Sequence, residues 1–186
     1  MIVILSGVSG AGKDTIKRIL MGKDGRIKTL PSYTTREKRV NEIEGQNYYY
    51  VSKEKFKEMI DNNEFYEYSV HHGNYYGTNK KLLNERIKNN IVLKDIDVNG
   101  TEDLLKIFRG TDIKIISIFL NISKEEMLRR LSNRDDKLKQ EEIELRMERY
   151  DYEMNHIGIY DYVIKNEDAE KTSNIILDII KREQEQ

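Results

Sequence analysis

Short apolar runs alternate with longer amphipathic segments along most of this 186-residue chain. Four runs rich in Ile and Val predict buried strands, at residues 2–5, 91–96, 113–120 and 162–164. Runs of this length and composition are typical of parallel strands that are covered on both faces, because such strands show no polar alternation.

The segments between these runs place apolar residues at helical spacing, and they predict helices over residues 15–21, 80–88, 98–108, 123–131, 141–155 and 168–181. In the last of them the isoleucines between residues 175 and 180 fall on one face, and Asp168 is a suitable N-terminal cap. This alternation of strand and helix predicts a doubly wound α/β core with a parallel sheet.

Two regions break the alternation. Residues 32–78 contain closely spaced tyrosines, a helix-like segment at 53–62 and a glycine turn at 73–74, and they predict a small mixed insertion. Residues 132–148 are rich in charge. A segment of this kind buries little apolar surface, so we expect it to be mobile or to close only over a ligand.

A glycine-rich motif joins the first predicted strand to the first predicted helix. It reads Gly7-Val8-Ser9-Gly10-Ala11-Gly12-Lys13. Glycines let the backbone turn its N–H groups inward toward phosphate oxygens, and the helix N-terminus adds partial positive charge at the same point. The lysine then supplies a mobile point charge for the terminal phosphates. Strand, glycines, lysine and helix together predict a P-loop that binds a nucleoside triphosphate.

The position after the lysine departs from the usual pattern, which has a hydroxyl residue there to hold Mg²⁺. Here that residue is Asp14, and Thr15 follows it. A carboxylate also binds Mg²⁺, but it repels the phosphates.

Composition excludes several classes of site. The net charge of -1 predicts no broad surface for nucleic acid. The absence of cysteine excludes disulfides, thiol catalysis and cysteine-bound metal. With no signal-peptide pattern and no apolar run of membrane-spanning length, we expect a cytoplasmic chain that does not contact membrane. The histidines His71, His72 and His156 show neither an evident partner nor zinc-like spacing.

Seven further segments, in order and spacing, resemble the guanylate kinases of the nucleoside monophosphate kinase group. They are Ser32-Tyr33-Thr34-Thr35-Arg36, Gly45-Gln46-Asn47-Tyr48, residues 63–67, residues 73–78, Asp95-Ile96-Asp97, residues 130–134 and residues 160–164. The resemblance runs nearly end to end, and it implies ATP-dependent phosphorylation of GMP and of dGMP, with Mg²⁺, by a monomer or homodimer.

The resemblance also implies three parts. A P-loop kinase core with a parallel sheet flanked by helices would comprise residues 1–31, 79–131 and 149–186. A small mixed α/β insertion that binds GMP would comprise residues 32–78, and a helical lid residues 132–148.

Residue roles carry over from the same resemblance. It implies that the ATP site comprises Gly7, Val8, Ser9, Gly10, Ala11, Gly12, Lys13, Asp14 and Thr15, with Asn166 beside the adenosine. It implies that the GMP phosphate is held by Arg36, Arg39, Tyr48 and Tyr76. Glu67 would read guanine by accepting from its ring N–H and amine, and the base pocket would be completed by Ser32, Thr78 and Asp97. A hydroxyl there can donate to the guanine carbonyl.

Catalysis would rest on positive charge around the transferred phosphoryl group. The implied catalytic residues are Lys13, Arg36, Arg130, Arg134 and Arg146. The implied contacts to Mg²⁺, direct or through water, are Asp14 and Asp95.

Three departures from the family pattern keep alternatives open. The proline and glycine usual after Thr-Thr-Arg are absent, glycines do not flank Arg134, and Asp14 follows the lysine. Lysine followed by aspartate also occurs in the related ribose 1,5-bisphosphate phosphokinases, but Glu67 disfavours that activity. A non-catalytic guanylate-kinase-like binding module is disfavoured by Lys13 and the lid arginines.

Overall fold

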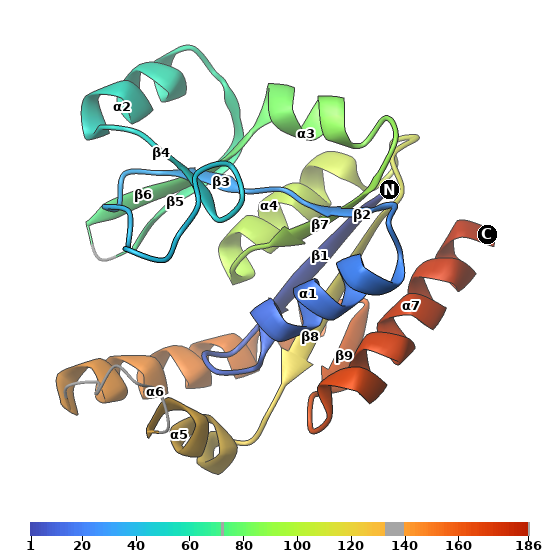
Figure 1. Cartoon of the computed structure of the whole chain (residues 1–186). Coiled ribbons are helices and arrows are strands. Elements are labelled where there is room, and N and C mark those ends of the chain that lie inside the picture. The colour runs from blue at the N-terminus through green and yellow to red at the C-terminus, as the bar shows by residue number, and fades with distance from the viewer. Residues whose placement is uncertain (72, 133–139, 186) are drawn as a thin grey trace. The chain divides into compact units, whose positions relative to one another are not determined.

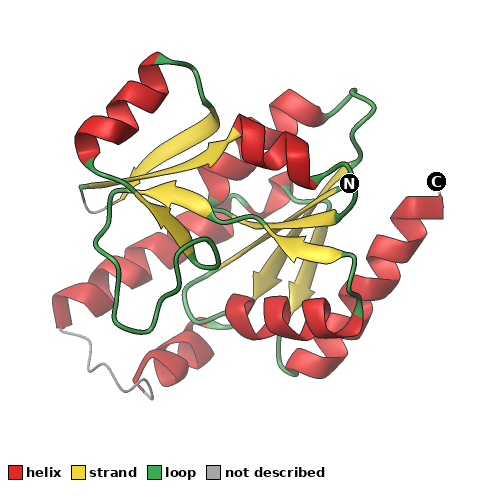
Figure 2. Ribbon diagram, turned by 45° about the horizontal axis from the view of Figure 1, so that its top comes forward, coloured by secondary structure: helices red, strands yellow, loops and turns green. Residues whose placement is uncertain are grey.

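The computed structural model describes residues 1–71, 73–132 and 140–185, as a mixed α/β structure (Figure 2). Its strands are β1 (Ile2–Gly7), β2 (Ile27–Thr29), β3 (Ser32–Thr34), β4 (Tyr48–Tyr50), β5 (Phe65–His71), β6 (Asn74–Asn79), β7 (Ile91–Asp95), β8 (Ile115–Asn121) and β9 (Tyr162–Lys165). Its helices are α1 (Lys13–Lys23), α2 (Lys53–Asp61), α3 (Lys80–Arg86), α4 (Val98–Phe108), α5 (Lys124–Ser132), α6 (Gln140–Asn155) and α7 (Ala169–Glu185), with a 3₁₀ turn at Ile157–Ile159.

The chain divides into two compact units. The first unit contains Met1–Ile2 and Arg26–Ile115, and the second contains Val3–Gly25 and Ile116–Gln186. The predicted core, insertion and lid divide the chain differently, and that three-part division stays a prediction. The predicted lid includes residues 133–139, which lie outside the described residues.

In the first unit, β2 and β7 pair in parallel with Ile27 opposite Ile91, and β7 lies beside the start of β1, where the Val92 N–H donates to the Met1 carbonyl at 2.9 Å. The same unit holds a four-stranded sheet in the order β4-β3-β6-β5. Helix α2 packs on this sheet through Phe56, which stacks on Phe65 with ring centroids 4.5 Å apart.

In the second unit, β1, β8 and β9 are neighbours, and β8 pairs with β9 in parallel with Ile118 opposite Tyr162. Residues Ile2–Leu5 are fully buried, as their continuous apolar run predicts. Helices α1 and α7 lie side by side (Figure 1). Asp168 caps α7 by accepting from the Lys171 N–H at 2.9 Å, so the predicted cap is confirmed.

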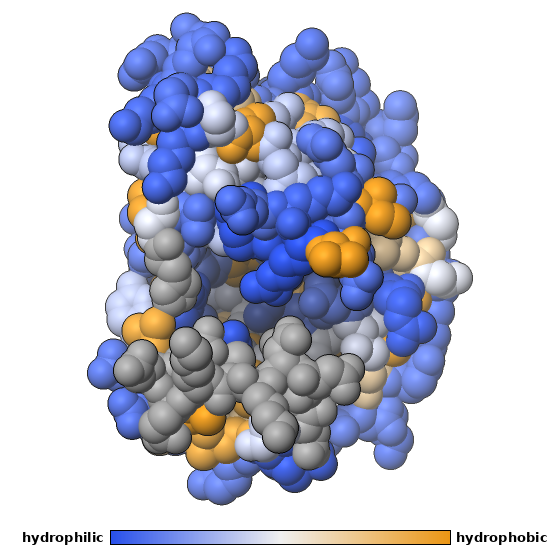
Figure 3. All heavy atoms as spheres, turned by 60° about the vertical axis from the view of Figure 1, so that its left-hand side comes forward, coloured by the Kyte–Doolittle hydropathy of each residue, from blue (hydrophilic) through white to orange (hydrophobic). Residues whose placement is uncertain are grey.

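The predicted strands and helices each correspond to an observed element, with ends that differ by up to four residues. The sequence reading missed β2, because only one of its three residues is buried and so short a segment shows no apolar pattern. No helix among the described residues is both long enough and apolar enough to cross a bilayer. The face drawn in Figure 3 is mostly hydrophilic, with scattered hydrophobic side chains.

Candidate functional site

The glycine-rich loop between β1 and α1 (residues 7–13, the glycine loop) contains two glycines against which neighbouring atoms pack closely. Gly7 has a φ of 151°, and a Cβ there would lie 2.5 Å from the Leu120 carbonyl oxygen. Gly12 has a φ of 90°, and a Cβ there would lie 2.8 Å from Asn166 Nδ2. A side chain at either position would be strained by the backbone conformation and crowded by a neighbouring group.

Helix α1 begins directly after this loop. Its N-cap, Gly12, provides no side chain to cap the first N–H groups, which leaves the positive end of the helix dipole available to an anion. Lys13 Nζ donates to the Gly7 carbonyl at 2.7 Å, so its ammonium lies over the loop. These features form a cradle for phosphate groups.

Asp14, the departure from the usual motif, lies on the surface of α1. Its side chain is 96% exposed, and it forms an ion pair with Lys17 one turn along the helix at 2.7 Å. The neighbouring cation offsets the negative charge that Asp14 adds near the loop.

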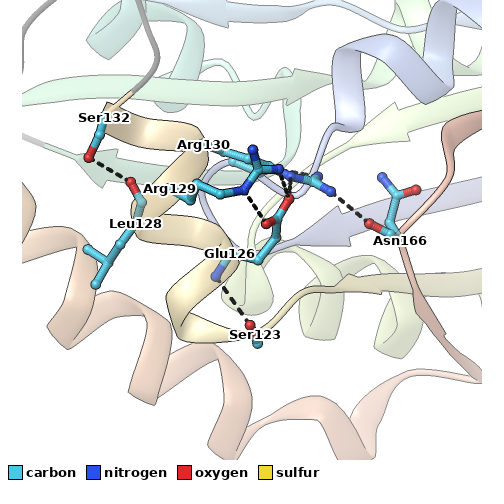
Figure 4. A network of polar contacts seen from close by, with 8 residues as sticks. Ser123, Glu126, Leu128, Arg129, Arg130, Ser132 and Asn166 are labelled. Atoms are coloured by element: carbon cyan, nitrogen blue, oxygen red, sulfur yellow. Dashed lines mark hydrogen bonds and ion pairs between the residues drawn. The ribbon is translucent and has the colours of Figure 1, made fainter.

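Arg130 ties α5 to the glycine loop (Figure 4). Its guanidinium donates to the Gly10 carbonyl at 3.2 Å, to the Asn166 carbonyl at 3.0 Å and to Glu126 Oε1 at 2.5 Å. Hydrogen bonds from Arg129 and Arg130 lower the pKa of the Glu126 carboxyl to about 2. Glu126 thus stays ionised at neutral pH and holds Arg130 in place.

Asn166 and Arg146 reach the same loop. Buried Asn166 donates through Nδ2 to the Ala11 carbonyl at 2.6 Å, while its Oδ1 has no hydrogen-bond partner among the described residues. Arg146, on α6, donates to Ser9 Oγ at 2.5 Å. Arg134, the remaining predicted arginine of this group, lies outside the described residues.

In the first unit, the Glu42 carboxylate binds two residues predicted to hold phosphate, Arg36 and Arg39, and also Tyr50. We call these residues the Glu42 cluster (Arg36, Arg39, Glu42, Tyr50). Glu42 accepts from Arg36 Nη2 at 2.6 Å, from the Arg39 backbone N–H at 2.9 Å and from the Tyr50 hydroxyl at 2.8 Å. Burial raises the pKa of the Glu42 carboxyl, but these hydrogen bonds outweigh it and bring the pKa down to about 2.

The two tyrosines predicted to accompany these arginines lie close to Arg36. The guanidinium carbon of Arg36 is 5.3 Å from the centroid of the Tyr48 ring, and Tyr48 meets Tyr76 edge to face at 5.9 Å. The side chain of Arg39 is exposed, and only its backbone joins the cluster. Two tyrosine rings, from β4 and β6, and the Arg36 guanidinium thus lie close together.

A second group of the first unit, the Glu67 cluster (Ser32, Glu67, Thr78, Lys94), is largely buried. Pairing of β5 with β6 places Glu67 opposite Thr78, whose hydroxyl donates to Glu67 Oε1. Glu67 is 7% exposed and Lys94 is 1% exposed. Burial raises the pKa of the Glu67 carboxyl, and the charge of Lys94 and the Thr78 hydroxyl act in the opposite direction. Lys94 Nζ lies 2.5 Å from Ser32 Oγ.

Asp95 is the last residue of β7, and Asp97 follows two residues later, directly before α4. Asp97 caps α4 by accepting from the Gly100 N–H at 2.9 Å, and its other oxygen lies 2.6 Å from His71 Nε2. The sequence showed no evident partner for His71, and the structure supplies one in Asp97, which lies far from β5 in the chain. Asp95 is half-buried at the end of β7.

Sequence reasoning missed Glu42, Lys94 and His71. A lysine within the apolar run 91–96 was the one signal that pointed to Lys94. Glu42 stands in a loop of charged residues, where nothing distinguishes it from its neighbours.

Across residues 1–71, 73–132 and 140–185, no group of three His, Asp or Glu side chains is arranged to hold a metal ion.

Comparisons with known proteins agree across nearly the whole chain. The sequence profile of the family described as guanylate kinase matches residues 1–183. A guanylate kinase of Prochlorococcus marinus is 40% identical over 182 residues, which cover 97% of this chain and 96% of that protein. One from Bartonella henselae is 40% identical over 97% of this chain and 82% of its own length.

A solved structure agrees with these sequence matches. The crystal structure of guanylate kinase from Anaplasma phagocytophilum superposes with a TM-score of 0.80 at 31% identity, covering 100% of this chain and 87% of that one.

Proposed function

The chain belongs to the guanylate kinase family and is an enzyme that phosphorylates GMP at the expense of ATP, and from this premise we propose which of its groups hold each substrate. A GMP phosphate oxygen attacks the γ-phosphorus of ATP, the bond to the β–γ bridging oxygen breaks, and ADP leaves. The attacking oxygen is already anionic, so the reaction needs positioning and positive charge rather than a general base.

The ATP half of the site is proposed to be the glycine loop, acting as a P-loop. Its backbone N–H groups and the N-terminus of α1 would cradle the phosphates, with Lys13 exchanging the Gly7 carbonyl for a phosphate oxygen. The unpartnered Asn166 Oδ1, buried beside Ala11, supports a contact to the adenosine, since the adenine amine is a donor that could satisfy it.

Charge on the transferred group is proposed to be stabilised by Arg130, Arg146 and Arg134. Support for the first two comes from their hydrogen bonds to the glycine loop, at Gly10 and Ser9. Arg130 also donates to Glu126, and this contact would help to orient its charge before the reaction, as transition-state stabilisation requires.

The GMP phosphate is proposed to bind Arg36, Arg39, Tyr48 and Tyr76. A guanidinium donates to a phosphate in bidentate fashion, and phenolic hydroxyls add neutral donors. In the absence of ligand, the Glu42 carboxylate takes the Arg36 donor Nη2 at 2.6 Å and keeps the guanidinium oriented. Arg39, whose side chain is exposed, is free of this restraint.

The observation that carries the base assignment is the buried carboxylate of Glu67. Guanine presents a ring N–H and an amine side by side, and a carboxylate accepts from both, whereas adenine offers no such pair. An unpaired buried carboxylate is costly, so the pocket should reject adenine strongly. Asp97 lies nearby, since a Cβ on Gly100, which Asp97 caps, would come within 3.0 Å of Glu67 Oε2.

Mg²⁺ is proposed to arrive with ATP and to neutralise phosphate charge. The residues available to it near the glycine loop are Asp14 and Thr15, with Asp95 as a further carboxylate in the first unit. We further propose that dGMP is a substrate, that the chain works as a monomer or homodimer, and that it acts in the cytoplasm, where ATP and GMP are held.

One assay tests the proposal: ADP formation from Mg-ATP with GMP, dGMP, AMP, UMP, CMP or ribose 1,5-bisphosphate as acceptor. We expect turnover with GMP and dGMP alone, at about 1–100 s⁻¹. Turnover with ribose 1,5-bisphosphate alone would transfer the chain to the related phosphokinases. No turnover with any acceptor, together with measurable GMP binding, would indicate a binding module instead.

The Glu67 assignment has its own test. Replacing Glu67 with Gln exchanges one acceptor for a donor, and we expect kcat/KM for GMP to fall roughly tenfold to a hundredfold, so that the GMP:AMP ratio shrinks. The matched control is Glu58→Gln, an exposed carboxylate on α2 that pairs only with Lys55. An unchanged GMP:AMP ratio in Glu67→Gln would refute the assignment.

A further inference from the structure

Lys94 is the most unusual residue of the Glu67 cluster. It lies in β7 within an otherwise apolar run and is 1% exposed. Taking an ammonium group out of water is costly unless hydrogen bonds and an opposite charge compensate it. Lys94 Nζ donates to Ser32 Oγ at 2.5 Å and to the Leu30 carbonyl at 3.4 Å, and Glu67 is near enough for their charges to interact.

The hydrogen bond from Lys94 decides what the Ser32 hydroxyl can do. An ammonium has only donors, so Ser32 Oγ must act as the acceptor in that bond. The hydroxyl proton of Ser32 therefore points away from Lys94. Within the described residues it donates to no protein group, which leaves it available to a ligand.

Thr78, the other hydroxyl of the cluster, is used differently. Its proton goes to Glu67 Oε1, in a buried hydrogen bond across β5 and β6. A hydroxyl has a single proton, so Thr78 cannot also donate to a base. Of the two hydroxyls, Ser32 alone retains a proton for an acceptor on the ligand.

We propose that Lys94 is a positioning residue that fixes the Ser32 hydroxyl as a hydrogen-bond donor, and that this donor selects a purine with a carbonyl at C6. This inference rests on the proposed GMP pocket, in which a hydroxyl is already expected to donate to the guanine carbonyl. It adds which of the two hydroxyls donates, and that Lys94 fixes its proton. Glu67 reads the ring N–H and the C2 amine, and the Lys94–Ser32 pair reads the C6 carbonyl. Adenine, with an amine at C6, would set a donor against a donor.

Substrate analogues separate the two readings. 6-Thio-GMP differs from GMP only at C6, where sulfur is a poorer acceptor than oxygen, and IMP differs only in lacking the C2 amine. The variant Lys94→Met keeps the length of the side chain and removes its charge, so the site stays filled. Thermal denaturation tests whether the variant is folded. We expect that it is, since replacing a buried charge with an apolar group of similar volume is often tolerated.

In Lys94→Met we expect the GMP:6-thio-GMP ratio of kcat/KM to fall by up to about tenfold, the upper value for one hydrogen bond between neutral groups. The GMP:IMP ratio should stay within about twofold, because Glu67 still reads the amine. Ser32→Ala should lower the GMP:6-thio-GMP ratio to the same extent, and the double variant should lower it no further.

Other outcomes overturn the proposal. Equal falls in both ratios in Lys94→Met would show that Lys94 only supports the pocket or the charge of Glu67. An unchanged GMP:6-thio-GMP ratio in Lys94→Met would show that Lys94 does not position Ser32, and an unchanged ratio in Ser32→Ala would show that Ser32 does not read C6. Should Lys94→Met fail to fold, Ser32→Ala alone decides, since a retained ratio refutes the inference. A separate measurement tests the proposed pocket itself. If the GMP:IMP ratio of kcat/KM is the same in Glu67→Gln as in the unchanged protein, Glu67 does not read the C2 amine and the pocket assignment fails.

Discussion

The glycine loop of the second unit presents mainly backbone groups, whereas the Glu67 cluster of the first unit presents side chains that are buried and charged. Around the loop, Lys13, Arg130 and Asn166 all bond to backbone carbonyls. In the cluster, the hydrogen bonds of Glu67 and Ser32 run between side chains that come from β3, β5, β6 and β7. A phosphate-binding site built on backbone tolerates many side chains and needs glycines, while a base-reading site needs particular side chains, which here come from strands of both sheets.

The largest effect that would test this contrast is expected at Lys13. Replacing Lys13 with Ala removes the point charge over the loop but no base contact, so kcat should fall by about 10³-fold or more while the Kd for GMP stays nearly unchanged. Steady-state kinetics and calorimetric titration with GMP measure the two quantities. The matched control is Arg18→Ala, an exposed cation on the same helix, which should leave both unchanged.

A GMP affinity that falls with kcat in Lys13→Ala would contradict the separation of the two sites. Unchanged turnover would exclude Lys13 from phosphoryl transfer.

A smaller effect, on stability, is expected at Gly12. Gly12→Ala would force a side chain into a φ of 90° and toward Asn166 Nδ2 at 2.8 Å, so the free energy of unfolding should fall by about 1–3 kcal/mol. Denaturant unfolding measures it. Gly22→Ala is the matched control, since a Cβ there meets nothing within 4 Å and the helical position should gain up to about 1 kcal/mol. Equal effects at both glycines would mean that the loop conformation imposes no special constraint.

The smallest effect concerns Glu42 and pH. Its pKa is about 2 in the folded chain against an ordinary 4.5, so its contribution to stability is complete above pH 4.5 and is lost as pH falls toward 2. In Glu42→Gln the free energy of unfolding should therefore fall less steeply as the pH is lowered from 4.5 to 2. The remaining slope belongs partly to Glu126, whose pKa is also about 2.

The same variant should raise KM for GMP by roughly threefold to tenfold, because the partner that orients Arg36 loses its charge and one of its two acceptor oxygens. Acid unfolding curves and kinetics check the two effects, with the exposed Glu37→Gln as control. An unchanged acid slope would refute the assigned pKa, and an unchanged KM would show that Glu42 does not orient Arg36 for substrate.

Much of the fold could be predicted because its signals are local. The apolar runs that become β1, β7, β8 and β9 are buried strands, and the helical periodicity of 98–108 gives α4 with the predicted ends. β2 escaped because a three-residue strand with one buried residue carries no pattern of its own. Its place follows from pairing with β7, which lies more than sixty residues later in the chain.

The sequence by itself determined the strand–loop–helix order around Lys13, since each part of that arrangement depends on neighbours within a few residues. It also marked Glu67, Ser32 and Thr78 through their resemblance to a known family. Only the tertiary structure decided that Thr78 donates to Glu67, that Lys94 donates to Ser32 and that Glu42 restrains Arg36. The direction of a hydrogen bond and the balance of a buried charge depend on which groups the fold brings within about 3 Å, and no local pattern encodes that distance.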